Sequence, residues 1–333
     1  RMILLLALVI STTVFILAYT ATQQQRTVDS ANFSVGADFS GQSAPNPHHL
    51  TVARQAAAYR ATSGVVSAST GYVTSIPNQS TNSTTDIVAA DTATYANTVL
   101  WTSQYSDQSL SSLMSLLTSH SSDVTNNDTV PAIIDDSMAK TQGLAVGDSF
   151  LQPTVDGYTM RFVVVGQVHA IPGVYDGSYR FSTYGLLCDY QSYATVYAKN
   201  SGNTLDTNFV WLQTNSDAAS LTSVRHAYPA LQDRRALIAS EESNPLYVNV
   251  NGVLYLGIAT ALLLALLGTL FFAWMNASGR LTNFAVLRAL GMAPRQIAAV
   301  LLWEQGGIYV AGLVLGLALG LFLLPRLPQL DKT

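Results

Sequence analysis

The sequence predicts an α+β extracytoplasmic domain that is inserted between transmembrane α-helices. The 333 residues are 49% hydrophobic but only 11% charged, whereas soluble globular domains carry roughly 25% charged residues. The apolar residues are clustered at the two ends of the chain, and the long polar block between them mixes strand-like alternation with helix-like spacing. These three observations indicate a membrane protein with one large polar domain.

Three apolar stretches are long enough to cross a hydrocarbon core of roughly 30 Å, which takes about 20 residues in a helix. They cover residues 2–22, 252–275 and 297–325. A cleaved signal peptide is the alternative for the first stretch, but its apolar run exceeds a usual signal-peptide core, which favours a retained helix.

The distribution of basic residues predicts how the chain is oriented across the membrane. Residues 276–296 contain Arg280, Arg288 and Arg295 and no acidic residue, so this loop should be cytoplasmic. The polar block, residues 23–245, is then extracytoplasmic, and the chain is a multi-pass protein of the plasma membrane. The block has 18 acidic and 10 basic residues, which argues against a nucleic-acid partner.

The polar block is predicted to contain both helices and strands, without an internal repeat. Strand patterns cover residues 33–39, 65–76, 130–134, 158–168, 209–212 and 235–239; helical patterns cover residues 50–61, 110–117 and 217–228; residues 76–86 have the composition of a loop.

Motifs for catalysis are weak. Ser137 and Lys140 fit the S-x-x-K spacing of acyl-transfer enzymes, but the S-D-N and K-T-G motifs that accompany it there are absent, and an ordinary helix start is favoured. No spacing typical of a zinc site occurs. No Gly-Lys dipeptide occurs, which excludes a Walker A loop. The chain is therefore predicted not to be an enzyme and to hold no cofactor of its own.

The loop between the second and third spans is predicted to form a short helix that begins after Ser278 and ends at Gly291, with Pro294 just beyond. Its apolar side chains surround most of the circumference and leave Arg280, Asn283 and Arg288 as the polar residues. Such a helix either lies among lipid headgroups or docks on a cytoplasmic partner.

Glu304 is an acidic residue inside the third predicted span. A carboxylate is costly in hydrocarbon, so Glu304 is a candidate functional residue. The alternative is that it reaches interfacial water, because it lies about two turns from the cytoplasmic end of the span.

Residues 283–291, NFAVLRALG, and residues 295–297, RQI, resemble the signature of the FtsX-like permease family of ABC transporters. Asn283 stands where the family often has glutamate. Glycines that follow Glu304 resemble the next helix of that family. The polar block resembles the MacB-type periplasmic core domain in residues 131–135, 143–148 and 162–166.

This resemblance implies a permease subunit that works with a separate cytoplasmic ABC ATPase, which would hold the ATP and Mg²⁺, and with a second permease copy or half within membrane lipid. The ATPase would dock on Arg280, Asn283, Phe284, Leu287, Arg288, Leu290, Gly291 and Arg295. Family members export or extract lipoproteins, peptides, antibiotics or lipids, or activate cell-wall enzymes.

Such a module has four spans. The three found here, with residues 326–333 as a tail, lead us to expect the C-terminal module of a longer, duplicated permease. The alternative function is a membrane-tethered extracytoplasmic sensor or adhesion domain without energy coupling.

Overall fold

The computed structural model describes residues 2–46, 49–78, 82–121, 124, 128–174, 182–279, 291 and 293–323. The chain divides into two compact units. Val28–Ser240 form a unit that we call the sheet domain, and Arg1–Thr27 with Glu241–Thr333 form a second one, the helical unit.

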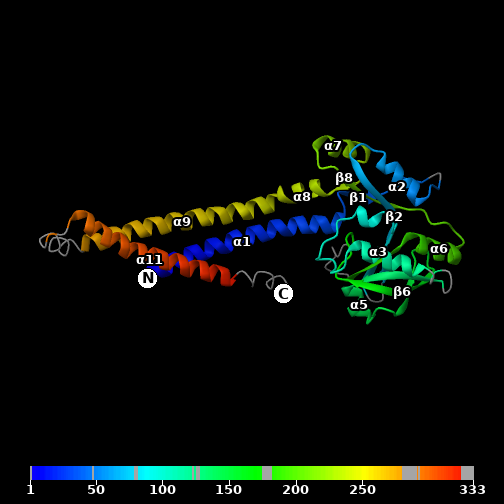
Figure 1. Cartoon of the computed structure of the whole chain (residues 1–333), viewed down its shortest axis with the longest axis horizontal. Helices are drawn as coiled ribbons and strands as arrows, with labels where there is room; N and C mark the ends of the chain where they lie inside the picture. The colour runs from blue at the N-terminus through cyan, green and yellow to red at the C-terminus, as the bar shows by residue number, and fades with distance from the viewer. Residues whose placement is uncertain are drawn as a thin grey trace. The chain divides into compact units, whose positions relative to one another are not determined.

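Long apolar helices form the helical unit (Figure 1), and the last part of the first helix, from Val28 on, belongs to the sheet domain. These helices are α1 (Met2–Val35), α9 (Pro245–Gly279) and α11 (Pro294–Leu323). Two segments, Leu6–Val35 and Val248–Phe272, are long and apolar enough to cross a membrane. The apolar part described within α11, Gly306–Phe322, is shorter, so the third span and the multi-pass topology remain predictions.

Within this unit α11 packs closely on α1. Gly312, Gly316 and Gly320 are buried and recur every four residues, so they share one face of α11. A Cβ atom at Gly316 would lie 2.7 Å from Cβ of Ile10 and 2.9 Å from the carbonyl oxygen of Ala7. These glycines allow the two backbones to approach each other.

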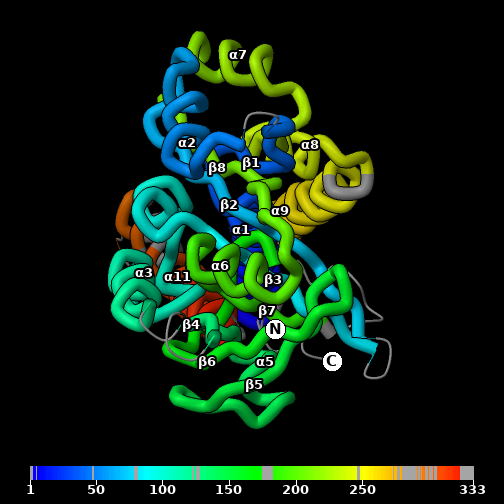
Figure 2. Tube along the Cα trace, turned by 90° about the vertical axis from the view of Figure 1, so that its right-hand side faces the viewer, coloured from blue at the N-terminus to red at the C-terminus, as the bar shows by residue number. Residues whose placement is uncertain are grey.

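The described strands of the other unit form one mixed, nine-stranded sheet (Figure 2). Its order is β5-β6-β4-β7-β3-β2-β8-β1-β9. The pairs β3/β7 and β4/β6 are parallel, and the other pairs are antiparallel. The strands are β1 (Phe39–Gln42), β2 (Val65–Asn78), β3 (Ser83–Ala90), β4 (Thr129–Asp135), β5 (Ser149–Pro153), β6 (Thr159–Val168), β7 (Ser182–Asp189), β8 (Phe209–Thr214) and β9 (Gln232–Asp233).

Helices cover both faces of the sheet and create three hydrophobic cores. On one face α5 (Asp136–Gln142) and α6 (Tyr190–Ser201) pack on β3, β4, β6 and β7. On the opposite face α3 (Leu110–Ser119) and the 3-10 turn η1 (Tyr95–Asn97) cover alternate residues of the same strands. Helices α2 (Val52–Arg60) and α7 (Ala218–Ala227) enclose the third core beside β2 and β8.

Most predicted elements of the polar block are confirmed, and four expectations are wrong. Phe33 and Val35 belong to α1, because Gly36, at φ +69°, ends the helix there. Residues 235–239 belong to helix α8 (Arg234–Glu242). Most of the predicted loop 76–86 lies in the paired strands β2 and β3. Ser278 lies inside α9 and does not cap a new helix.

Candidate functional site

The predicted partner-binding segment lies mainly outside the described residues. This applies to Arg280, Asn283, Phe284, Leu287, Arg288 and Leu290, and to the short helix predicted there. Gly291 has φ +92°, a conformation suited to the predicted stop. Arg295 is exposed in the first turn of α11. Glu304 belongs to α11, but its side chain is outside the described part.

The start of α11 explains part of the R-Q-I motif. Pro294 is the first residue of the helix, where its missing N–H is not needed. The side-chain oxygen of Gln296 accepts a hydrogen bond from the backbone N–H of Ala293 at 3.0 Å. Gln296 therefore satisfies a backbone donor at the entrance to α11, a local structural role.

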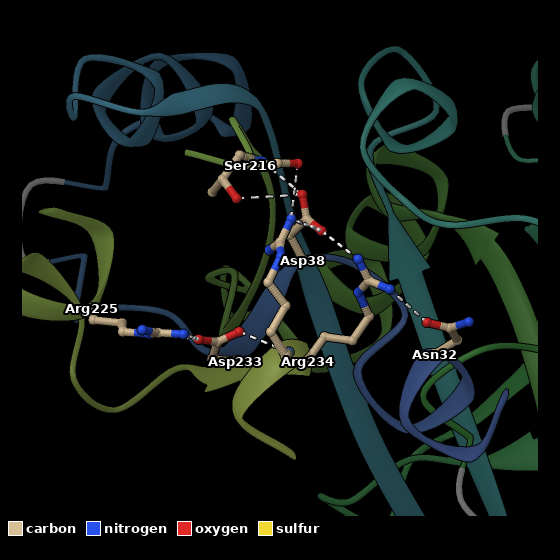
Figure 3. A network of polar contacts seen from close by, with 8 residues as sticks. Asn32, Asp38, Ser216, Arg225, Asp233 and Arg234 are labelled. Atoms are coloured by element: carbon tan, nitrogen blue, oxygen red, sulfur yellow. Dashed lines mark hydrogen bonds and ion pairs between the residues drawn. The ribbon is translucent and has the colours of Figure 1, made fainter. Parts of the chain in front are cut away.

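A second candidate site is a set of polar residues where the sheet domain begins and ends, which we call the polar junction (Figure 3). Asp38, between α1 and β1, is its centre. Its carboxylate is buried and accepts hydrogen bonds from the backbone N–H of Thr214 at 2.9 Å and from Arg234 Nη2 at 3.0 Å. Arg235 Nη2 lies 3.2 Å from the same carboxylate.

Arg234 joins the two ends of the domain. It is the first residue of α8, and its backbone N–H donates to the carbonyl oxygen of Asp38 at 3.1 Å. Its Nη1 donates to Asn32 Oδ1, in the last turn of α1, at 2.9 Å. One side chain therefore binds the helix that enters the domain and the residue that follows it, as Figure 3 shows.

The same junction includes α7. Asp233 in β9 is buried, accepts a hydrogen bond from Arg225 Nε of α7 at 2.6 Å, and accepts one from the backbone N–H of Arg235 at 2.9 Å. Strand β9 also pairs with β1, with Asp233 opposite Phe39. Each buried carboxylate thus faces guanidinium groups, the arrangement that makes burial of charge tolerable.

The contacts of the polar junction hold neighbouring segments of the chain together. Its arginines are committed to carboxylates, and the described residues contain no group of His, Cys, Asp and Glu that could hold a metal ion. Through these contacts the junction joins the end of α1 to the start of α8 and to strands β1 and β9.

The interpretation of Ser137 and Lys140 as an acyl-transfer pair gains no geometric support. Lys140 Nζ donates to Asp136 Oδ2 at 3.3 Å, and no hydrogen bond joins it to the exposed Ser137. A hydrogen bond from Gln167, with smaller effects of His169 and Lys140, lowers the pKa of Asp136. Lys140 therefore pairs with Asp136 and is not placed as a base for Ser137.

Sequence reasoning missed the polar junction. Asp38 falls within the strand pattern of residues 33–39 and Arg235 within that of residues 235–239, whereas Arg234 belongs to no predicted element. A signal was present: an acidic residue directly after the first apolar helix, and an Arg-Arg pair shortly before the second. The spacing of about 200 residues in sequence gives no indication that they meet.

The fold and the site define a class: a protein in which a mixed α/β domain is tied at both ends to apolar helices. Residues 255–332 match the family described as FtsX-like permease C-terminal. No curated protein matches the chain. This match agrees with the FtsX-like permease resemblance that the motif at residues 283–297 predicts, and it is consistent with a fragment of such a permease. The family consists of membrane-embedded components of ABC transporters, which are not themselves enzymes.

Proposed function

We propose that the chain is the permease subunit of an ABC transporter in which a separate ATPase moves the sheet domain through α1, α8 and α9. The family match over residues 255–332 carries this proposal, because it includes the whole predicted docking segment from Arg280 to Arg295. The cargo would be a lipoprotein, peptide, antibiotic or lipid that is exported or extracted.

The polar junction supplies the mechanical link that this function needs. Helix α1 runs without a break from residue 2 to residue 35, and an unbroken helix transmits displacement along its axis. The bonds of Arg234 to Asn32 and Asp38 join its last turn to α8. ATP-driven movement of the helices would then reach β1 and β9 together, as a rigid-body displacement.

The test is photocrosslinking from residue 287 in native membranes. A photoreactive amino acid in place of Leu287 should capture an ABC ATPase subunit, because this apolar side chain lies in the predicted docking helix. The matched control carries the same amino acid in place of Leu256 on α9, an exposed leucine in an apolar helix, and should label lipid only. Labelling of lipid alone at both positions would contradict the proposal and favour the tethered sensor.

A further inference from the structure

The outer strand of the sheet, β5, is open on one side. It is the edge strand, and it pairs only with β6 among the described strands (Figure 2). Just beyond the two ends of this strand pair, the backbone N–H of Val164 donates a hydrogen bond to the carbonyl oxygen of Asp148, and that of Thr154 donates to the carbonyl oxygen of Tyr158. Bonded pairs alternate along an antiparallel ladder, so the residues between them, Ser149 and Leu151, direct their N–H and C=O groups away from β6.

Within the part of the chain that the structure describes, this edge shows few of the features that protect natural edge strands. Such edges usually carry charged side chains, proline or a covering element, which prevent pairing with other chains. Here Pro153 protects only one end, while Leu151 in the middle of the strand is 61% exposed. Val146 and Val155, on either side of β5, are exposed to a similar degree.

A groove of about 750 Å³ runs beside this strand. Its lining is Asp128, Thr129, Ser149, Leu151, Thr159, Arg161, Val163 and Asn200. Arg161 lies opposite Leu151 in the register of β5 and β6 and is exposed. Among the described residues no carboxylate pairs with it, whereas Asp128 is already paired with Lys199. The groove therefore offers one free cation next to an apolar side chain.

These features select one kind of ligand. A row of outward N–H and C=O groups is satisfied by another extended backbone, the mode of recognition by strand addition. Leu151 would neighbour the added strand directly and favours an apolar side chain there, whereas the long side chain of Arg161, one strand further in on β6, favours an acidic side chain on the same face. We propose that β5 binds an extended segment of a partner protein with this pattern as an additional strand. The proposal goes beyond the transport function and does not depend on it.

The experiment uses the full chain in lipid nanodiscs and a fluorescein-labelled nonapeptide that alternates valine and threonine around one glutamate. Fluorescence anisotropy should show saturable binding. Leu151→Pro removes an outward N–H and should weaken binding about tenfold, whereas Val66→Lys, at an exposed valine of β2 (53%), should have no effect. Equal binding to Leu151→Pro and the native protein would overturn the proposal.

Charge exchange tests the assignment of Arg161. Arg161→Glu should weaken binding of the glutamate peptide about fivefold, and a peptide with lysine in that position should restore it. Hydrogen exchange on the native protein covers the case in which Leu151→Pro fails to fold. The peptide should protect the amides of Ser149 and Leu151. Protection elsewhere without protection of these two amides would place the peptide at another site and refute strand addition at β5.

Discussion

At the scale of single residues, Asp38 is the most constrained charge of the sheet domain. Its carboxylate faces Arg234 and Arg235, so Asp38→Asn leaves two partly buried guanidinium groups without a counterion. We expect a loss of about 2 kcal/mol in the free energy of unfolding, since breaking a buried pair from one side is strongly destabilising. Urea unfolding of the full chain, followed by tryptophan fluorescence, measures it.

Asp107→Asn is the control for that substitution, because the carboxylate of Asp107 is 92% exposed. A stability change for Asp38→Asn no larger than that of the control would show that the polar junction is energetically unimportant.

The buried Asp86 makes the stability of the sheet domain depend on pH. Burial raises the pKa of this carboxyl group, an effect only partly offset by a hydrogen bond from Ser75. The folded state therefore binds the proton more tightly than the unfolded state, so the stability that Asp86 contributes is complete below pH about 3.8 and falls as the pH rises through the folded-state pKa.

Asp86→Asn should consequently stabilise the domain at neutral pH and have little effect at pH 3. A series of unfolding measurements from pH 3 to 8 on both proteins checks this. A difference between them that is constant over the whole series would contradict the assignment.

At the scale of elements, the pairing of α1 with α11 depends on glycine. A side chain at residue 316 has no room, because Ile10 and the carbonyl oxygen of Ala7 occupy the space of a Cβ. Gly316→Leu should destabilise the pairing by about 2 kcal/mol or more. Gly268→Leu on α9, where nothing lies within 4 Å of the built Cβ, gains the same helix propensity and should be tolerated.

An engineered disulfide can test the pairing of α1 with α11. A Cβ atom at Gly312 would lie 3.2 Å from Cβ of Leu6. A disulfide needs about 3.5–4.5 Å between these atoms, so a small separation of the two helices should let cysteines at both positions form a bridge on mild oxidation. The one native thiol, Cys188, is fully buried and should not compete. Gly316→Leu should lower the yield of this bridge; an unchanged yield would mean that the two helices pair through another face.

Elements could be predicted from the sequence where one hydrophobic periodicity dominates. The prediction failed where contacts between distant segments determine the local structure. Helix α3 and strand β6 are examples of success, since each shows one clean pattern. Residues 33–39 alternate like a strand, yet the helix continues to Val35. The carbonyl groups of the last helical turn accept hydrogen bonds there. The N–H of Gly36 donates to the carbonyl oxygen of Asn32, and the N–H of Gly173 donates to the carbonyl oxygen of Phe33. The polar junction was not predictable for the same reason, because its ion pairs join distant segments.

At the scale of the whole molecule, the polar junction predicts coupling. In a complex with the proposed ATPase, spin labels at Val146 and Val253, both exposed, should report a change in the distance between them on binding of ATP. The double variant Arg234→Gln, Arg235→Gln removes the side-chain bonds between α8 and Asp38. The ATP-dependent change in the distance between the labels should then become smaller, or the distribution of distances broader. Lys140→Gln, at an exposed residue away from the junction, is the control. An undiminished change in the double variant would show that force passes by another route.

The pairing of β1 with β9 has a consequence for protein engineering and for evolution. Phe39 and Asp233 are opposite each other on neighbouring strands, and paired strands lie only about 5 Å apart. The domain between them therefore begins and ends at almost one point, as in domains that tolerate transplantation. A different folded cassette with adjacent termini could replace residues 40–232 while the ends of α1 and α8 keep their spacing, so the sheet domain can diversify while the helices that flank it stay constant.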